Sequence, residues 1–132
     1  MTTLEQFENV LTALAIWREA RGESLAARDG VYHVIRNRTL DAANRWPKTF
    51  SGVILQTLQF SSFNAHDPNA AKIPTATDGA FIQCCAIVDS PGADPTSGAN
   101  HYLSIPAGDP LPSWADSNKI TCTIGPFTFY RF

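Results

Sequence analysis

The chain has few of the features that hold a protein on a nucleic acid or in a membrane. Its net charge is −2, so it lacks the strongly basic face on which nucleic-acid binding depends. No apolar run approaches the roughly 18 residues that a membrane-spanning helix needs. Residues 1–8 include Glu5 and Glu8 where a secretion signal would carry basic residues. The sequence therefore predicts no nucleic-acid partner, no membrane insertion and no export signal of its own.

Cysteine is also scarce. The three cysteines cannot all pair, and Cys84 and Cys85 are adjacent, which places them poorly for a bridge to each other. We expect reduced thiols buried as small apolar groups, in keeping with synthesis in a cytosol.

The chain does contain enough apolar material for one core. Of its 132 residues 44% are hydrophobic, and eight are phenylalanine. A chain of this length buries roughly two thirds of its unfolded surface, and it shows no linker-like stretch and no internal repeat. We expect a single domain over residues 1–132.

Helical signals dominate the first part of the chain. Thr2 or Thr3 can cap a helix, with Glu5 or Gln6 completing a capping box, and the pattern runs down to Gly22. Apolar residues at helical spacing should form the buried face of this helix: Leu4, Phe7, Val10, Leu11, Leu14 and Ala15.

A second helix is predicted from about Ser24 to Arg38. Gly30 in its middle lowers helix propensity by roughly 1 kcal/mol relative to alanine, which indicates a close contact with another helix. The residues expected to pack inward are Leu25, Val31, Val34 and Ile35.

The rest of the chain mixes helices and strands. Residues 50–56 read as a short helix and residues 80–88 as a buried one. Residues 101–105 read as a strand, and residues 120–124 and 127–130 alternate with a period of two around a Gly-Pro turn, which predicts a hairpin. Helices first and a small antiparallel sheet late indicate an α+β domain.

Glu19 is the candidate catalytic acid. It stands on the border of the apolar face of the first helix, just before Gly22, where a packed helix gives way to an open turn. A carboxyl group in such a place is partly desolvated yet reachable, as a general acid must be. The competing interpretation is a surface ion pair with Arg21, and spacing alone does not decide between the two.

An ordered set of motifs accompanies Glu19. Residues 15–23 read AIWREARGE and residues 30–38 read GVYHVIRNR. The later segments are QFS at 59–61, DPTSGANHY at 94–102, PSW at 112–114 and IGPFTFY at 124–130. From about residue 12 to the C-terminus, this set resembles the spore-cortex-lytic type of cell wall hydrolase, a lysozyme-like family that acts on bacterial peptidoglycan. No single segment is specific, but their order is.

The resemblance implies a lysozyme-like α+β domain that cleaves the bond between N-acetylmuramic acid and N-acetylglucosamine. Glu19 would protonate the leaving oxygen and then serve as base, in a lytic transglycosylase or in a hydrolytic muramidase. Gln59, Ser61 and Tyr102 match family positions that line the groove and are predicted to orient the sugar. His101 either does the same or satisfies its ring within the sheet.

The transglycosylase is preferred because hydrolysis usually takes a second carboxyl group. Glu23 follows a glycine, and Asp67 and Asp94 stand beside prolines where they would cap turns. Under either mechanism Glu19 should have a raised pKa, with Trp17 and the following aromatic residues as desolvating neighbours.

Two positions depart from the family pattern. Phe127 stands where a histidine is common, and Ser97 where a glycine is common. No role is assigned to either residue.

Two other classes of function remain open. A zinc-dependent amidase or peptidase would need about three ligands, yet His33, His66 and His101 are scattered and form no His-x-x-x-His pair. A non-catalytic wall-binding module would keep the groove but tolerate loss of Glu19. We predict neither a metal ion nor a cofactor.

The expected partner is the glycan strand of peptidoglycan. An enzyme that acts on this extracytoplasmic polymer without an export signal fits a phage endolysin, made in the host cytoplasm and released to the wall through a membrane lesion. The charge balance and loop-rich middle are compatible with a monomer.

Overall fold

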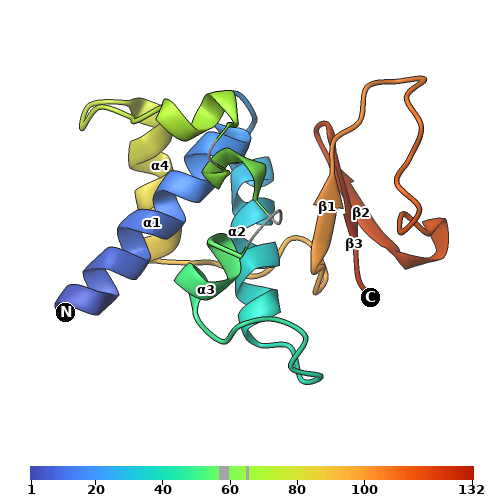
Figure 1. Ribbon diagram of the computed structural model, residues 1–132, viewed down its shortest axis with the longest axis horizontal. Helices are drawn as coiled ribbons and strands as arrows, with labels where there is room; N and C mark the ends of the chain where they lie inside the picture. The colour runs from blue at the N-terminus through green and yellow to red at the C-terminus, as the bar shows by residue number, and fades with distance from the viewer. Residues whose placement is uncertain (57–59, 65) are drawn as a thin grey trace.

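The computed structural model describes residues 1–56, 60–64 and 66–132. Helices form one part of the molecule and a small antiparallel sheet forms the other (Figure 1). The helices are α1 (Thr3–Ala20), α2 (Leu25–Thr39), α3 (Phe50–Ile54) and α4 (Gly79–Asp89). Short 3-10 turns occur at η1 (Ser61–Phe63), η2 (Pro68–Ala71) and η3 (Ser117–Lys119). The predicted α+β architecture is confirmed.

Helix α1 begins as its sequence predicts. The Thr2 hydroxyl accepts a hydrogen bond from the Glu5 backbone N–H (3.1 Å), and the Glu5 carboxylate accepts one from the Thr2 backbone N–H (2.7 Å). This capping box satisfies donors that the first turn would otherwise leave unpaired.

The predicted buried face of α1 is wrong for its first half. Leu4, Phe7 and Val10 are 66%, 50% and 60% exposed. In Figure 1 the start of α1 projects from the edge of the helical part, so an apolar pattern there has little to pack against. The buried residues lie in the second half: Thr12, Ala13, Ala15, Ile16, Trp17, Arg18 and Ala20.

Helix α2 is buried over most of its length. The Ser24 side chain caps it by accepting a hydrogen bond from the Ala27 N–H (3.2 Å). Val31, Val34 and Ile35 are buried as predicted. Leu25 is not, because this first residue of the helix points into solvent and is 53% exposed.

Gly30 marks a close contact, but with the sheet rather than with another helix. A Cβ atom at this position would lie 2.6 Å from Cζ of Phe129. Only a residue without a side chain allows the Phe129 ring to lie this near the backbone of α2. The glycine therefore sets the distance between α2 and the sheet.

The helix at residues 80–88 is only partly buried, contrary to its prediction. The Asp78 side chain caps α4 by accepting a hydrogen bond from the Phe81 N–H (2.9 Å). Cys84 and Ile87 are buried where α4 packs on α1, whereas Ile82 is 52% exposed. An apolar run does not by itself show how many faces of a helix are covered.

The sheet consists of β1 (His101–Leu103), β2 (Ile120–Ile124) and β3 (Phe127–Tyr130) in the order β1-β3-β2. Both pairings are antiparallel, and Tyr102 lies opposite Phe129. Gly125 supplies the positive φ of +56° that the turn between β2 and β3 needs. The predicted hairpin is confirmed, and the first strand ends two residues earlier than predicted.

The cysteines are free, as expected. Cys84 is buried, and its burial raises the pKa of the thiol to about 11. Cys85 and Cys122 are partly exposed and also unbridged. Within the described residues, no helix is both long and apolar enough to cross a membrane.

Candidate active site

Glu19 lies in the last turn of α1, where the helix gives way to the turn that leads into α2. Its side chain is partly exposed, although the neighbouring Arg18 and Ala20 are buried. Burial is the main cause that raises the pKa of the Glu19 carboxyl above its ordinary value. The carboxyl group is therefore desolvated yet reachable, as its sequence position predicts.

Tyr102 holds Glu19 from the other part of the molecule. Its hydroxyl donates a hydrogen bond to Glu19 Oε1 at 3.1 Å, across 83 residues of sequence. This bond stabilises the carboxylate and lowers the Glu19 pKa, which partly offsets the effect of burial. Burial and the nearby carboxylate raise the pKa of Tyr102 itself, so the phenol keeps its proton and remains a donor.

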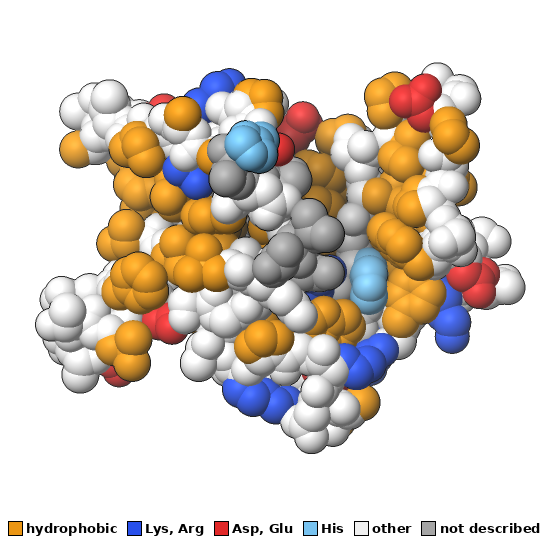
Figure 2. Space-filling model, in the orientation of Figure 1, with side chains coloured by type: hydrophobic (Ala, Val, Ile, Leu, Met, Phe, Trp, Pro, Cys, Tyr) orange, Lys and Arg blue, Asp and Glu red, His pale blue; other side chains and the backbone are white. Residues whose placement is uncertain are grey.

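The ring of Tyr102 is fixed by two phenylalanines of β3. Phe127 meets it edge-on with ring centroids 5.3 Å apart, and Phe129 lies 6.0 Å away. Phe129 in turn packs against Gly30 of α2. A continuous set of contacts thus runs from α2 through the sheet to the acid on α1. Figure 2 shows that this face of the molecule is indented between the helical part and the sheet.

Tyr102 is the aromatic residue that bonds Glu19, and the polar contact of Trp17 is made elsewhere. The Trp17 indole N–H donates to Asp78 Oδ1 (3.3 Å), which places the ring against α4. Arg21 stacks over Trp17 (4.9 Å) and donates to Asn69 Oδ1 (3.3 Å). No described residue forms an ion pair with Glu19, so the surface pair with Arg21 is wrong.

Arg18, next to Glu19, anchors the loop that follows α3. It donates to the backbone oxygens of Ser62 (3.3 Å), Ala70 (3.0 Å) and Lys72 (3.1 Å). Because a guanidinium offers five donors in a rigid fork, one side chain can hold several carbonyls. This role was not predicted from the sequence. The one feature that could have indicated it is the presence of an arginine in a helix predicted to pack.

The Asn37-Arg38 pair at the end of α2 holds the segment that leads into β1. Asn37 Nδ2 donates to Asp94 Oδ2 (2.9 Å) and to the Ala99 oxygen (2.8 Å). Arg38 Nε donates to the Asn100 oxygen at 2.7 Å. These bonds position the strand that carries Tyr102. The motif was noted in the sequence, but its structural role was not predicted.

The four predicted sugar-orienting residues have different outcomes. Gln59 lies outside the described residues. Ser61 begins η1, so its backbone is placed in the segment that Arg18 helps to hold. His101 and Tyr102 are adjacent in β1 and partly exposed. The structure brings Tyr102 onto Glu19 directly.

One nitrogen of the His101 ring has a hydrogen-bond partner at the start of the sheet. Its Nδ1 lies 2.8 Å from Asn100 Oδ1, and its ring is surrounded by other aromatic rings. Burial, Arg38 and Arg45 lower the pKa of His101 to about 4. The ring is therefore uncharged at neutral pH.

The candidate second carboxyl groups differ in how fully they are engaged. Asp94 accepts hydrogen bonds from Asn37, the backbone N–H and hydroxyl of Thr96, and the Gly98 N–H. Asp67 caps η2 through the Asn69 N–H (2.8 Å). Both carboxylates therefore cap turns as predicted. The charge of Asp67 also raises the Glu19 pKa, so it is electrostatically coupled to the candidate acid.

The two departures from the family pattern have structural explanations. Phe127 is buried and supports the ring of Tyr102. Ser97 has a φ of +56°, in the left-handed region that glycine adopts most readily. A glycine at the second position would therefore relieve backbone strain.

Nothing in the described ranges forms a group of three or more histidine, cysteine, aspartate or glutamate side chains that could hold a metal ion. The three histidines also differ in surroundings. His33 is buried with both ring nitrogens near backbone oxygens, those of Asp29 (2.9 Å) and Gly92 (3.2 Å). His66 is exposed.

A carboxyl group whose pKa is raised by burial is typical of the general acid in enzymes that cleave glycosidic bonds. The chain belongs to the cell wall hydrolase family, whose family model matches residues 22–130. The matched region starts just after Glu19, but structural similarity extends across nearly the whole chain. The resemblance to spore-cortex-lytic hydrolases is confirmed, and the chain is an enzyme of cell-wall degradation.

Two solved structures are similar to this one. The catalytic domain of the Bacillus cereus SleB protein is 28% identical with a TM-score of 0.73, covering 96% of this chain and 91% of that one. The catalytic domain of the germination-specific lytic transglycosylase SleB from Bacillus anthracis is 27% identical with a TM-score of 0.71, covering 94% and 93%. No curated protein is a significant sequence match.

Proposed function

We propose that this chain cleaves the glycosidic bond between N-acetylmuramic acid and N-acetylglucosamine in peptidoglycan, with Glu19 as the general acid. The observation that carries the proposal is the state of Glu19: its pKa is raised by burial while the side chain stays partly exposed. A raised pKa keeps a larger fraction of the carboxyl protonated at working pH, which is what proton donation to a leaving oxygen requires.

Tyr102 determines which oxygen of Glu19 carries the proton. Because its hydroxyl donates to Oε1, that oxygen acts as the acceptor and the acidic proton resides on Oε2. Oε2 is then the atom that protonates the sugar oxygen. The same hydrogen bond stabilises the carboxylate that forms when the proton leaves.

The mechanism we favour is lytic transglycosylation. The C6 hydroxyl of the muramic acid attacks its own anomeric carbon as the bond to the leaving oxygen breaks. Glu19 gives its proton to the leaving oxygen and then takes the proton of the C6 hydroxyl, so one carboxyl group serves both steps. The lytic transglycosylase activity of the similar Bacillus anthracis domain supports this choice.

Hydrolysis is the second candidate, and Asp67 favours it. Its carboxylate charge acts on Glu19, and within the described part of the chain its hydrogen bonding engages Oδ1, through the Asn69 N–H, and not Oδ2. A hydrolytic muramidase would use such a group to activate water or to attack the anomeric carbon.

Mass spectrometry of the muropeptides released from purified peptidoglycan tests the proposal. We expect 1,6-anhydro ends from the native protein and none from Glu19→Gln. Asp67→Asn should leave the products unchanged under transglycosylation and abolish cleavage under hydrolysis. Reducing muramic ends would contradict transglycosylation, and free peptides without glycan cleavage would indicate an amidase instead.

The biological setting stays a prediction of the sequence. We infer a single catalytic domain over residues 1–132 that works as a monomer and serves as a phage endolysin released from the host cytoplasm. Sedimentation of the purified protein tests the monomer. Lysis of bacteria that express the chain together with a membrane-permeabilising protein, but not without it, tests the route of release.

A further inference from the structure

An aromatic basin lies at the start of β1, made of Trp46, His101, Trp114 and Phe132. The His101 ring centroid is 5.6 Å from that of Trp46, 5.1 Å from Trp114 and 4.9 Å from Phe132. Trp114 is 38% exposed, and the other members are partly exposed. Rings from distant parts of the chain thus gather at the surface around His101, the residue that precedes Tyr102 in β1.

The hydrogen bonds of Asn100 determine which nitrogen of the His101 ring carries the proton. Asn100 Nδ2 donates to the Phe132 oxygen (3.0 Å), and its Oδ1 accepts from the Phe132 N–H (3.1 Å). The orientation of this amide is therefore set, and its oxygen faces His101 Nδ1 at 2.8 Å. An oxygen in that position requires Nδ1 to be the donor, so Nε2 of the neutral ring carries a lone pair.

No residue in the described part of the chain donates a hydrogen bond to Nε2 of His101. The two arginines that, after burial, help to lower the pKa of the ring also border the basin. Arg38 and Arg45 stack over the Trp46 ring at 5.2 and 4.8 Å. The basin therefore contains a neutral acceptor next to the exposed indole of Trp114 and the partly exposed indole of Trp46.

We propose that the aromatic basin is a subsite that binds one N-acetylated sugar ring of the glycan strand beside the cleavage site. Indole rings stack on the apolar C–H face of a pyranose, and a neutral acceptor suits a sugar hydroxyl or an acetamido N–H. The side chains of His101 and Tyr102 alternate across β1, and Arg38, which stacks over Trp46, acts electrostatically on both of them. Arg38 thus links this subsite to the acid that Tyr102 holds. The inference rests on the proposed glycan-cleaving function.

Packing alone does not account for this arrangement. A cluster that served only to seat the C-terminus would bury its rings, as Tyr130 is buried at 2% exposure. Trp114 instead keeps more than a third of its surface exposed, and the acceptor on His101 faces no described donor. An exposed aromatic group with an open polar atom is typical of a ligand site.

The test uses the full-length Glu19→Gln variant and the N-acetylglucosamine tetramer, a neutral oligosaccharide. Nuclear magnetic resonance would follow the indole N–H signals and the imidazole nitrogens during titration. We expect the signals of Trp46, Trp114 and His101 Nε2 to shift. Trp17, whose indole binds Asp78 on the far side of α1, serves as the internal control and should not shift.

Variants in the same background measure the contribution of each part. Trp114→Ala should weaken binding about tenfold or more, as expected for loss of an aromatic anchor. Leu111→Ala, an exposed apolar side chain in the same loop, is the matched control and should bind normally. His101→Phe keeps a ring but removes the acceptor and should weaken binding about fivefold.

Unshifted signals for both Trp46 and Trp114 would overturn the subsite, and so would native affinity in Trp114→Ala. Failure of the glycan-cleaving function has a different signature. In that case the native protein releases no anhydro or reducing ends from peptidoglycan, whatever the tetramer does to the basin. Cleavage without any effect of the tetramer on the basin refutes the subsite alone.

Discussion

Glu8 in the first half of α1 and Glu19 in the second half use their carboxyl groups differently. The carboxylate of Glu8 accepts two hydrogen bonds of 2.6 Å, from the backbone N–H and the hydroxyl of Ser51. Among the described residues, Glu19 accepts one hydrogen bond, from Tyr102, and its other oxygen accepts none. The Glu8 carboxylate links α1 to α3, whereas the Glu19 carboxyl group is positioned by a single hydrogen bond from a described residue.

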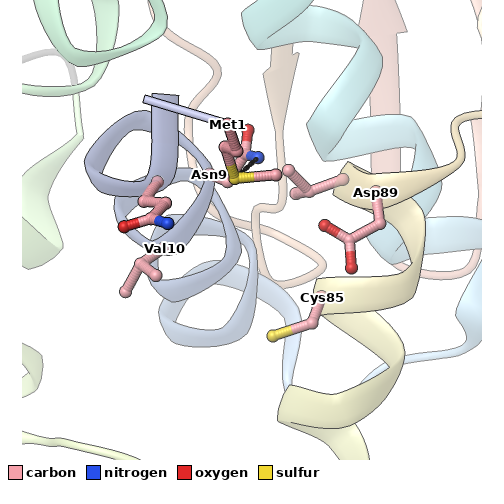
Figure 3. A pocket seen from close by; sticks show the side chains of 7 residues that line it. Met1, Asn9, Val10, Cys85 and Asp89 are labelled. Carbon is pink, nitrogen blue, oxygen red and sulfur yellow. Dashed lines mark hydrogen bonds between the residues drawn. The ribbon is translucent and has the colours of Figure 1, made fainter. Parts of the chain in front are cut away.

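The surroundings of the two halves differ in the same way. The first half shows apolar side chains to solvent and borders a shallow hollow with α4, lined by Met1, Asn9, Val10, Cys85 and Asp89 among others (Figure 3). The second half is enclosed by α2, α4 and the loop that Arg18 holds. A carboxyl group becomes a candidate acid where the fold removes water and leaves a lone pair free.

The largest expected effect is a difference in activity between substitutions of Glu19 and of Glu8. Glu19→Gln should lower the rate of peptidoglycan cleavage at least about 100-fold, because general acid catalysis contributes on that scale or more. Glu8→Gln should retain activity and lose about 1 kcal/mol of unfolding free energy, because its charge-assisted bonds become neutral ones. Turbidity clearance and thermal melting measure both. An equal loss of activity in Glu19→Gln and Glu8→Gln would show that Glu19 has no specific role in catalysis.

Truncation of apolar side chains tests the two halves by stability. Ile16→Ala, in the core, should lower the unfolding free energy by about 2–5 kcal/mol because it leaves a cavity. Phe7→Ala, half exposed, should change it by less than about 0.5 kcal/mol. Chemical denaturation of both variants provides the measurement. A large loss in Phe7→Ala would mean that the first half is covered in solution.

Gly30→Ala tests whether the sheet must lie close to α2 for the site to form. The added methyl group would overlap the Phe129 ring, and overpacking of this kind lowers stability by about 1–3 kcal/mol. Because Tyr102 sits on the same sheet, cleavage should fall as well. Gly79→Ala, where a Cβ meets no atom within 4 Å, is the control. Native activity in Gly30→Ala would show that catalysis does not depend on the close approach of the sheet to α2.

The smallest expected effects concern pH. Because the folded-state pKa of Glu19 is raised, its contribution to stability is present below the unfolded value of about 4.3 and is lost as the pH rises through the folded value. Glu19→Gln should thus melt slightly higher than the native protein at neutral pH and equally at low pH. The alkaline limb of kcat/KM should report the same group.

Tyr102→Phe sharpens the pH test. Removal of a donor that favours the carboxylate should raise the Glu19 pKa further and move the alkaline limb to higher pH. A purely structural role for the tyrosine would lower the rate without moving the limb. Rates measured across a pH series distinguish the two outcomes.

Local rules predicted the elements well. The capping box of α1, the Ser24 cap of α2 and the hairpin around Gly125 each depend on a few neighbouring residues, and all three are present. Burial was predicted less well. Leu4 and Leu25 fit helical apolar patterns yet face solvent, because burial depends on which elements lie alongside.

The sequence by itself determined the order of the elements and their caps and turns, since these follow from spacing along the chain. It also pointed to Glu19 as the acid to examine, through the ordered set of motifs around it. Only the tertiary structure decided that Tyr102 is the donor to Glu19, that Gly30 faces a ring of the sheet, and that Arg21 turns away from the acid. Such contacts join residues from distant parts of the chain, and local spacing carries no record of them. The raised pKa of Glu19 has the same origin, because desolvation is a property of the packed surroundings and not of the side chain.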